Sequence, residues 1–265
     1  MELADKVIVI TGGGTGIGEA LARRFAAARA KFIAVADIDN AGAARVAADI
    51  GGRAFPVDVS READIRALVS TVEAEQGPID LFCSNAGILL EGDEETPDAD
   101  WDRIWAINVK SHIYAARAVL PGMTRRGAGY LMQTVSAAGL MSQIGSASYS
   151  VTKHAALAFA EWLSIEKYAE GIRVSALCPQ GVHTSMLRNA GGGIADLLRE
   201  TAISAEQVAE AAVAGIAEER FLILPHPEVA LYFQHKAGDY ERWLRGMRRL
   251  KAKAGSGSPA AERVS

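Results

Sequence analysis

A tyrosine and a lysine stand four positions apart in the stretch SASYSVTKHAAL, residues 146 to 157. On an α-helix this spacing places Tyr149 and Lys153 on one face, with their polar ends within reach. A cation at about 4 Å contributes on the order of 4 kcal/mol at an effective dielectric of about 20. That interaction would lower the pKa of a phenol from about 10 by roughly two or three pH units. We therefore expect a phenol that exchanges protons near neutral pH; the alternative is an exposed pair without a chemical role.

A glycine-rich turn directly follows the first apolar run of the chain. The stretch TGGGTGIG, residues 11 to 18, carries Gly12, Gly16 and Gly18. Glycines at a strand-to-helix turn let the backbone approach a pyrophosphate, which then rests on the amides of the helix N-terminus. The spacing is a variant of the G-x-G-x-x-G pattern. It predicts nucleotide binding, the alternative being a turn without a ligand.

The second apolar run ends in an acid, Asp37. A carboxylate at this place can accept both ribose hydroxyls and repels a 2′-phosphate. The adjacent Ile38 and Asp39 supply no compensating basic side chain. The sequence therefore predicts NAD rather than NADP, while an ordinary turn or cap residue is the alternative.

Short apolar runs alternate with Ala-rich stretches of helical period along the chain. Strands that are apolar on both faces and alternate with helices are typical of a parallel sheet covered on each side. We expect a doubly wound, Rossmann-like α/β fold of about seven strands, with ligands beyond the carboxyl ends of the strands. The runs are residues 6–11, 32–37, 53–59, 79–85, 129–136, 172–179 and 220–225.

We expect a single domain over residues 1–254, with a helical extension from about residue 226. The last residues, 255–265, are small and polar, a composition that predicts a disordered tail.

Composition excludes several classes of function. The 265 residues carry a net charge of -4, which gives no electrostatic basis for nucleic-acid binding. No apolar run is long enough for a membrane span, and the N-terminus does not resemble a signal peptide. A cytoplasmic location is expected. Cys83 and Cys178 lie in apolar runs and are expected to be small buried residues, and the histidines show no metal-ligand spacing.

From Lys6 to about Pro225 the chain resembles the short-chain dehydrogenase/reductase family. The resemblance rests on TGGGTGIG, Asp37, DV at 58–59, NAG at 85–87, Asn108 in NVKS, Ser136 and YSVTK at 149–153. It implies an NAD-dependent oxidoreductase with a catalytic tetrad of Asn108, Ser136, Tyr149 and Lys153. The cofactor-binding residues it implies are Gly12, Thr15, Gly16, Ile17, Gly18, Asp37, Ile38, Asp58, Val59, Asn85, Ala86, Gly87, Tyr149, Lys153, Pro179, Gly181, Val182 and Thr184.

The residue types suit the roles that the resemblance implies. Tyr149 would take the hydroxyl proton of an alcohol while the carbon gives hydride to the nicotinamide. Lys153 would lower the phenol pKa and bond the nicotinamide ribose, and Ser136 would hold the substrate oxygen. Asn108 would hold a water beside Lys153.

The chain departs from the family pattern at two places. In PQGVHT, residues 179 to 184, Gln180 stands where glycine is common, which leaves the path of the nicotinamide loop open. After the seventh run an amphipathic helix rich in aromatic and basic residues replaces a short tail. We expect this helix to pack on its own domain, to cover the substrate cleft or to embrace a neighbouring subunit.

Three mostly apolar segments, residues 87–92, 137–145 and 184–194, are the candidate substrate pocket, so an apolar secondary alcohol or ketone is expected. The helices expected at about 98–123 and 148–169 form a dimer core in the resembling family. The second is apolar all round and expected to be buried on both sides, so we expect a homo-oligomer, a dimer or homotetramer. The alternatives are a non-catalytic dinucleotide-binding scaffold or sensor, and an epimerase or dehydratase of nucleotide sugars.

Overall fold

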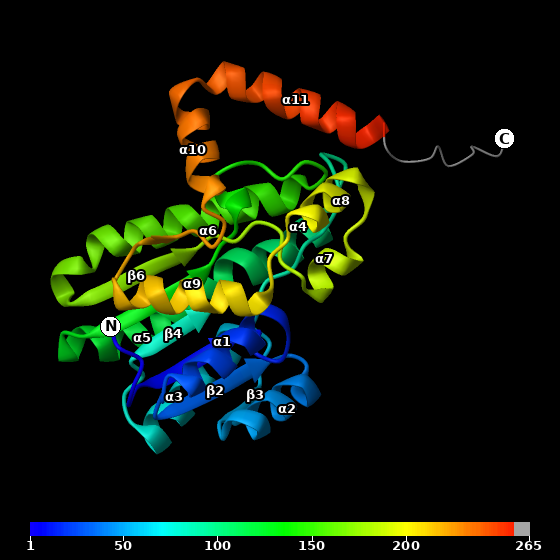
Figure 1. Cartoon of the computed structure of the whole chain (residues 1–265). Coiled ribbons are helices and arrows are strands. Elements are labelled where there is room, and N and C mark those ends of the chain that lie inside the picture. The colour runs from blue at the N-terminus through cyan, green and yellow to red at the C-terminus, as the bar shows by residue number, and fades with distance from the viewer. Residues whose placement is uncertain (257–265) are drawn as a thin grey trace.

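The computed structural model describes residues 1–256, and the strands of this part of the chain form one parallel seven-stranded sheet (Figure 1). The strand order is β3-β2-β1-β4-β5-β6-β7. The order reverses between β1 and β4, and in doubly wound sheets ligands bind at this point, beyond the carboxyl ends of the strands. The strands are β1 Val7–Thr11, β2 Phe32–Asp37, β3 Arg53–Pro56, β4 Leu81–Ser84, β5 Gly129–Thr134, β6 Ile172–Leu177 and β7 Leu222–Ile223.

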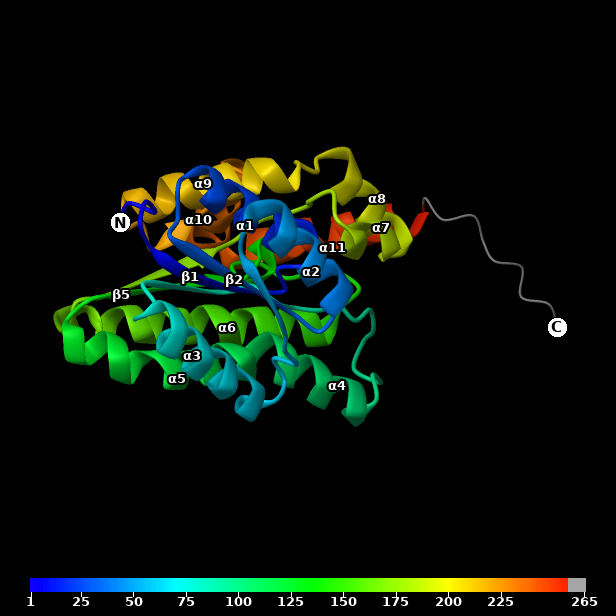
Figure 2. The ribbon, with the colours of Figure 1, turned by 90° about the horizontal axis from the view of Figure 1, so that it is seen from below.

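Helices cover both faces of the sheet (Figure 2). One face carries α1 Gly16–Ala27, α2 Asn40–Ile50 and α9 Ala205–Ala217; the other carries α3 Glu62–Gln76, α4 Asp98–Trp105, α5 Ser111–Arg126 and α6 Ala147–Glu166. Beyond the carboxyl ends of the strands lie α7 Ser185–Asn189 and α8 Gly192–Glu200, whereas α10 Glu228–Gly238 stands past the edge of the sheet and α11 Tyr240–Ser256 runs from it toward α8. The predicted Rossmann-like fold is confirmed.

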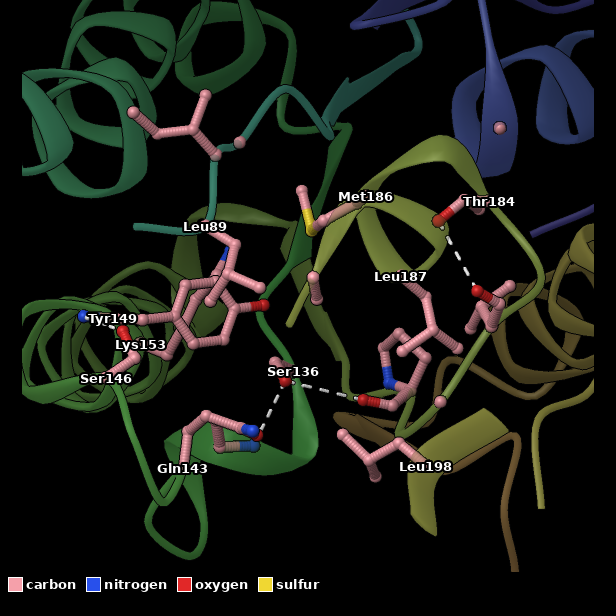
Figure 3. Close-up of a pocket in the computed structure, with 18 of the residues that line it drawn as sticks. Leu89, Ser136, Gln143, Ser146, Tyr149, Lys153, Thr184, Met186, Leu187 and Leu198 are labelled. Carbon is pink, nitrogen blue, oxygen red and sulfur yellow. Dashed lines mark hydrogen bonds between the residues drawn. The ribbon is translucent and has the colours of Figure 1, made fainter. Parts of the chain in front are cut away.

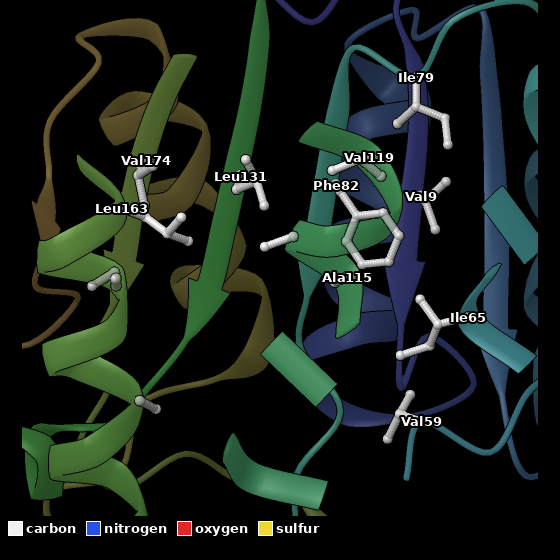
Figure 4. Packing of buried hydrophobic residues seen from close by; sticks show 14 of the residues in the cluster. Val9, Val59, Ile65, Ile79, Phe82, Ala115, Val119, Leu131, Leu163 and Val174 are labelled. Carbon is white, nitrogen blue, oxygen red and sulfur yellow. The ribbon is translucent and has the colours of Figure 1, made fainter. Parts of the chain in front are cut away.

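Alternation along the strands divides the core into two halves. In β1, Val9 belongs to the half beneath α3, α5 and α6, whereas Ile8 belongs to the half beneath α1, α2 and α9. Phe82 and Leu131 fill the first half and are not exposed to any appreciable extent (Figure 4). A strand that is buried on both faces is apolar at nearly every position. The apolar runs in the sequence therefore predicted where the strands lie.

Helix α6 is apolar on both faces, and within one chain only its inner face is buried. Its inner face, which includes Ala156 and Leu163, is buried. On its outer face Trp162 is 53% exposed and Ile165 is 77% exposed in the described chain. The apolar outer face expected from the sequence is therefore present and is exposed in the described chain.

Two helical segments are interrupted where the sequence predicted continuity. A π-helical turn, Ala106–Lys110, separates α4 from α5 and contains Asn108. The predicted C-terminal helix is broken into α10 and α11, and Asp239 caps α11 by accepting a hydrogen bond from the Arg242 amide at 2.9 Å.

The first two residues of the predicted disordered tail, 255 and 256, belong to α11 instead. Residues 257–265 of that prediction lie outside the described residues. No helix within residues 1–256 has the length and apolarity that crossing a membrane requires.

Candidate active site

A cavity of about 710 Å³ opens at the carboxyl ends of the strands, next to the switch point between β1 and β4. Its wall runs from the glycine-rich turn after β1 to the flap formed by α7 and α8, and it includes the last turns of α11. All of the predicted cofactor-binding residues except Gly18 line this cavity. Of the predicted tetrad, Ser136, Tyr149 and Lys153 line it and Asn108 does not.

The glycine turn brings backbone close to the place where α1 begins. Gly12 has a φ of +63°, and a Cβ there would lie 2.9 Å from Ala86 Cα. A Cβ on Gly18 would run into the Gly12 carbonyl oxygen, so Gly18 serves the packing of the helix on the turn and does not face the cavity. The free space beyond Gly12 and Gly16, at the N-terminus of α1, fits a pyrophosphate.

Asp37 lines the cavity at the end of β2, as expected. Its Oδ2 accepts a hydrogen bond from the Gly14 amide and its Oδ1 accepts one from the Asp39 amide, each at 2.9 Å. The fold also brings a basic residue that sequence reasoning missed, since Arg45 on α2 donates to the Gly14 carbonyl oxygen at 3.1 Å. Arg45 is paired with Glu19 at 2.8 Å, so its charge is already compensated.

Asn85 ties the glycine turn to the centre of the sheet. Its Nδ2 donates to the carbonyl oxygens of Thr11 and Gly12, at 3.0 and 3.2 Å. Its Oδ1 accepts from the Thr134 hydroxyl at 2.9 Å. The amide thereby fixes the turn relative to β5, the strand that leads to Ser136.

Ser136, Tyr149 and Lys153 converge on one part of the cavity (Figure 3). Ser136 follows β5, and its Oγ accepts from the Ala138 amide at 3.0 Å. Tyr149 lies in the first turn of α6, where Ser146 caps the helix by accepting from the Tyr149 amide at 3.3 Å. The Ser136 hydroxyl also donates to the Pro179 carbonyl oxygen at 3.5 Å, and it lies close enough to the phenol to oppose the rise in the pKa of Tyr149.

Lys153 is only 3% exposed, and its Nζ donates to the Thr134 carbonyl oxygen at 3.1 Å. The ammonium lies 5.5 Å from the centroid of the Tyr149 ring. The predicted spacing is therefore confirmed, with the cation over the phenol ring.

The expected direction of the phenol pKa is wrong for this geometry. Burial raises the pKa of Tyr149, although the hydrogen bond with Ser136 opposes that change. Burial lowers the pKa of Lys153 to about 8. Desolvation acts on both groups more strongly than their mutual interaction, because the ammonium binds the end of β5 and does not bind the phenol oxygen directly.

Asn108 lies behind the cavity wall and is fully buried. Its Oδ1 accepts from the Ile88 amide and its Nδ2 donates to the Ile88 carbonyl oxygen, both at 2.9 Å. A Cβ on Gly87 would lie 3.3 Å from Asn108 Oδ1 and 3.4 Å from Lys153 Nζ, so both side chains lie next to this glycine. The water that Asn108 was expected to hold stays a prediction.

A histidine that was not predicted from the sequence fixes the backbone of the loop PQGVHT, residues 179 to 184. His226 follows β7 and is 2% exposed. Its Nδ1 accepts from the Gln180 amide and its Nε2 donates to the Gly181 carbonyl oxygen, both at 3.1 Å. The ring is therefore the neutral Nε2–H tautomer, and burial lowers its pKa. Gln180 is accommodated because the bonds to His226 use only backbone groups.

The other end of the cavity is apolar, and the three predicted pocket segments contribute to it. Leu89, Met186, Leu187 and Leu198 point into this region (Figure 3). Lys251 of α11 also lines the cavity. Of the three placements considered for the C-terminal helix, packing on its own domain and covering the cleft both agree with this contact.

Both cysteines are free and buried, as predicted. Burial raises the pKa of Cys178 to about 12, so the thiol stays protonated. Residues 1–256 contain no group of three or more His, Cys, Asp or Glu residues arranged to hold a metal ion.

Comparison with known proteins agrees with this geometry. A sequence profile described as short chain dehydrogenase matches residues 6–193. The chain is 32% identical to 1-deoxy-11-beta-hydroxypentalenate dehydrogenase of Streptomyces exfoliatus, over 91% of this chain and 90% of the relative. It is 32% identical to meso-2,3-butanediol dehydrogenase of Serratia marcescens, over 76% of this chain and 80% of the relative.

Among solved structures, a short chain dehydrogenase/reductase from Burkholderia phymatum in complex with NAD matches with a TM-score of 0.83 and 27% identity, covering 91% of this chain and 96% of that chain. A 3-ketoacyl-(acyl-carrier-protein) reductase from Brucella melitensis complexed with NADH matches with a TM-score of 0.77 and 30% identity, covering 84% of this chain and 96% of that chain.

Proposed function

The chain belongs to the short-chain dehydrogenase family, and from this premise we propose that it transfers hydride between NAD and an apolar secondary alcohol or the corresponding ketone. The observation that carries the proposal is the convergence of Ser136, Tyr149 and Lys153 on a cavity that also includes the glycine turn. Relatives named as dehydrogenases of a butanediol and of a hydroxypentalenate support an alcohol or ketone as substrate.

The nicotinamide, when bound, supplies the carbon that accepts or donates hydride. Tyr149 then gives or takes the proton at the substrate oxygen. Ser136 orients that oxygen, because its hydroxyl lies beside the phenol and can donate to developing negative charge. Lys153 supplies a positive charge next to both groups from beneath the Tyr149 ring.

Neutral Tyr149 is the form that protonates an alkoxide, and burial favours this form by raising the phenol pKa. The arrangement is thus suited to ketone reduction at neutral pH. For alcohol oxidation the phenol has to lose its proton first, which an increase in pH favours.

The preference for NAD over NADP is part of the proposal and rests on Asp37. Its carboxylate lies at the end of β2 within the cavity wall, where it would repel a 2′-phosphate. Initial rates with NAD and NADP on a panel of secondary alcohols, followed at the absorbance of reduced nicotinamide, test both the reaction and this preference. Equal rates with the two cofactors would contradict the role given to Asp37.

No observation favours the alternative functions. A non-catalytic scaffold or sensor has no use for Ser136, Tyr149 and Lys153 in one place. Nucleotide-sugar epimerases and dehydratases are not favoured either, because the relatives that support the proposal are named as dehydrogenases.

We also propose a homo-oligomer, a dimer or tetramer, because the outer face of α6 exposes Val151, Trp162 and Ile165. Light scattering that found only a 28.0 kDa particle would contradict this part of the proposal. A cytoplasmic location stays a prediction.

A further inference from the structure

Lys251 lies on a different face of α11 from the other basic residues of this helix. Residues Leu244, Met247, Lys251 and Ala254 follow one another at intervals of three or four, so they form one stripe along the helix. Lys251 and Ala254 at the end of this stripe line the cavity. The remaining basic residues, Arg242, Arg245, Arg248, Arg249 and Lys253, lie at helical angles outside the stripe.

The position of α11 is fixed at both ends (Figure 1). Near its start, Lys236 of α10 is 9% exposed, donates to the Leu140 carbonyl oxygen at 2.8 Å and lies 4.9 Å from the Trp243 ring centroid. At the other end a Cβ on Gly193 would run into the Ala254 carbonyl oxygen, so α11 packs directly on α8. These contacts hold the stripe against the flap that bounds the substrate end of the cavity.

The other charged residues of the cavity wall already have partners or belong to its nucleotide end. Asp37 and Asp58 lie beside the glycine turn, and Lys153 binds Thr134. Glu91 accepts a hydrogen bond from the Gly191 amide at 2.5 Å. Lys251 has no hydrogen-bond or ion-pair partner within residues 1–256. Within the described chain, Lys251 thus contributes a charge without a partner to the same cavity wall as the apolar side chains of Leu89, Met186, Leu187 and Leu198.

We propose that Lys251 is a specificity-determining residue that binds a carboxylate on the substrate. This inference rests on the proposed function and narrows its substrate class. The preferred substrate is a hydroxy acid or oxo acid, in which an apolar body separates the carboxylate from the carbon that exchanges hydride. The apolar body occupies the region beneath α7 and α8, and the carboxylate emerges at the edge where α11 meets the flap. A cation there discriminates between an acid and its ester, which differ in charge and hardly in shape.

The test compares an oxo fatty acid, with its ketone next to the terminal methyl group, with the methyl ester of the same acid, over a series of chain lengths. The wild-type protein is expected to reduce the acid with a higher kcat/KM than the ester. In Lys251→Gln the ratio of the two kcat/KM values is expected to fall about fivefold, mainly through the KM of the acid. The preference of the wild type is also expected to weaken as the salt concentration rises.

Arg249→Gln is the matched control, because it removes the same charge from the outer face of the same helix. Its acid-to-ester ratio is expected to equal that of the wild type, and both variants are expected to keep wild-type affinity for NADH. Equal use of acid and ester by the wild type, or the same ratio in Lys251→Gln and Arg249→Gln, would overturn the role of Lys251 while leaving the proposed function intact. Failure of the wild type to reduce any ester or acid would overturn both.

Discussion

Replacing His226 by leucine is expected to loosen the loop that lies between β6 and α7. The imidazole bonds the Gln180 amide and the Gly181 carbonyl oxygen, both at 3.1 Å, and it is 2% exposed. Leucine fills a similar volume and offers neither a donor nor an acceptor. The substitution therefore removes the partner of the Gln180 amide and one of two donors to the Gly181 carbonyl oxygen, which also accepts from the Ile203 amide at 3.1 Å.

The size of the effect follows from the burial of these groups. A buried backbone group left without a partner costs about 1–3 kcal/mol. Only the Gln180 amide loses its partner completely, because the Gly181 carbonyl oxygen keeps the Ile203 amide, so the expected loss in the free energy of unfolding is about 1–3 kcal/mol. The Kd for NAD is expected to rise by about tenfold, because Pro179, Gly181 and Val182 line the cavity.

Urea unfolding and calorimetric titration with NAD measure these two quantities. His235→Leu is the control, because His235 lies on the adjacent helix and is exposed. His226→Gln is expected to lie between His226→Leu and the wild type, since its amide can keep one of the two bonds. If His226→Leu and His235→Leu had the same stability and the same affinity for NAD, the role assigned to His226 would be refuted.

The stability that His226 contributes through its hydrogen bonds to the loop is expected to depend on pH. Burial holds the pKa of His226 below its usual value, and only the neutral ring can accept the hydrogen bond from Gln180. Between the folded and unfolded pKa values the unfolded chain binds more protons. The contribution to stability is therefore complete above the unfolded pKa and is lost as the pH falls through the folded pKa. His226→Leu is expected to remove this part of the acid dependence.

Three further predictions concern the site directly. Lys153→Met is expected to lower kcat by at least about a hundredfold, because it removes the cation beneath the Tyr149 ring, and steady-state rates at saturating cofactor measure this loss. Asp37→Ala is expected to raise the ratio of kcat/KM with NADP to that with NAD by about tenfold, and an unchanged ratio would show that another residue sets the preference. The rate of alcohol oxidation is expected to rise with pH into the alkaline range, since burial raises the pKa of Tyr149, while ketone reduction is expected to decline over the same range; pH profiles in both directions check this opposition.

The sequence was sufficient where the chemistry is local. The glycine turn, Asp37 at the end of β2 and the helical spacing of Tyr149 and Lys153 all depend on short stretches whose conformation is set by nearby residues. The apolar runs located the strands because a strand of a parallel sheet is buried on both faces and is therefore apolar at nearly every position.

Other parts of the site depend on contacts between distant segments. The hydrogen bond between Gln180 and His226 joins residues 46 positions apart, so no local sequence pattern predicts it. The pKa of Tyr149 was misjudged for a related reason, since Lys153 turns to the carbonyl oxygen of Thr134 on another element and both groups are desolvated by their surroundings. The amphipathic character of the C-terminal helix was visible in the sequence, but the contact of α11 with α8 is a property of the fold.

Proton transfer by Tyr149 is the central claim, and Tyr149→Phe tests it most directly. The phenylalanine ring keeps the packing over Lys153 and lacks only the hydroxyl. In single-turnover reduction of a ketone, followed at the absorbance of NADH, the rate is expected to fall by at least about a hundredfold while the Kd for NADH stays within about twofold of the wild-type value. A variant that binds NADH normally and reduces the ketone at the wild-type rate would contradict the claim.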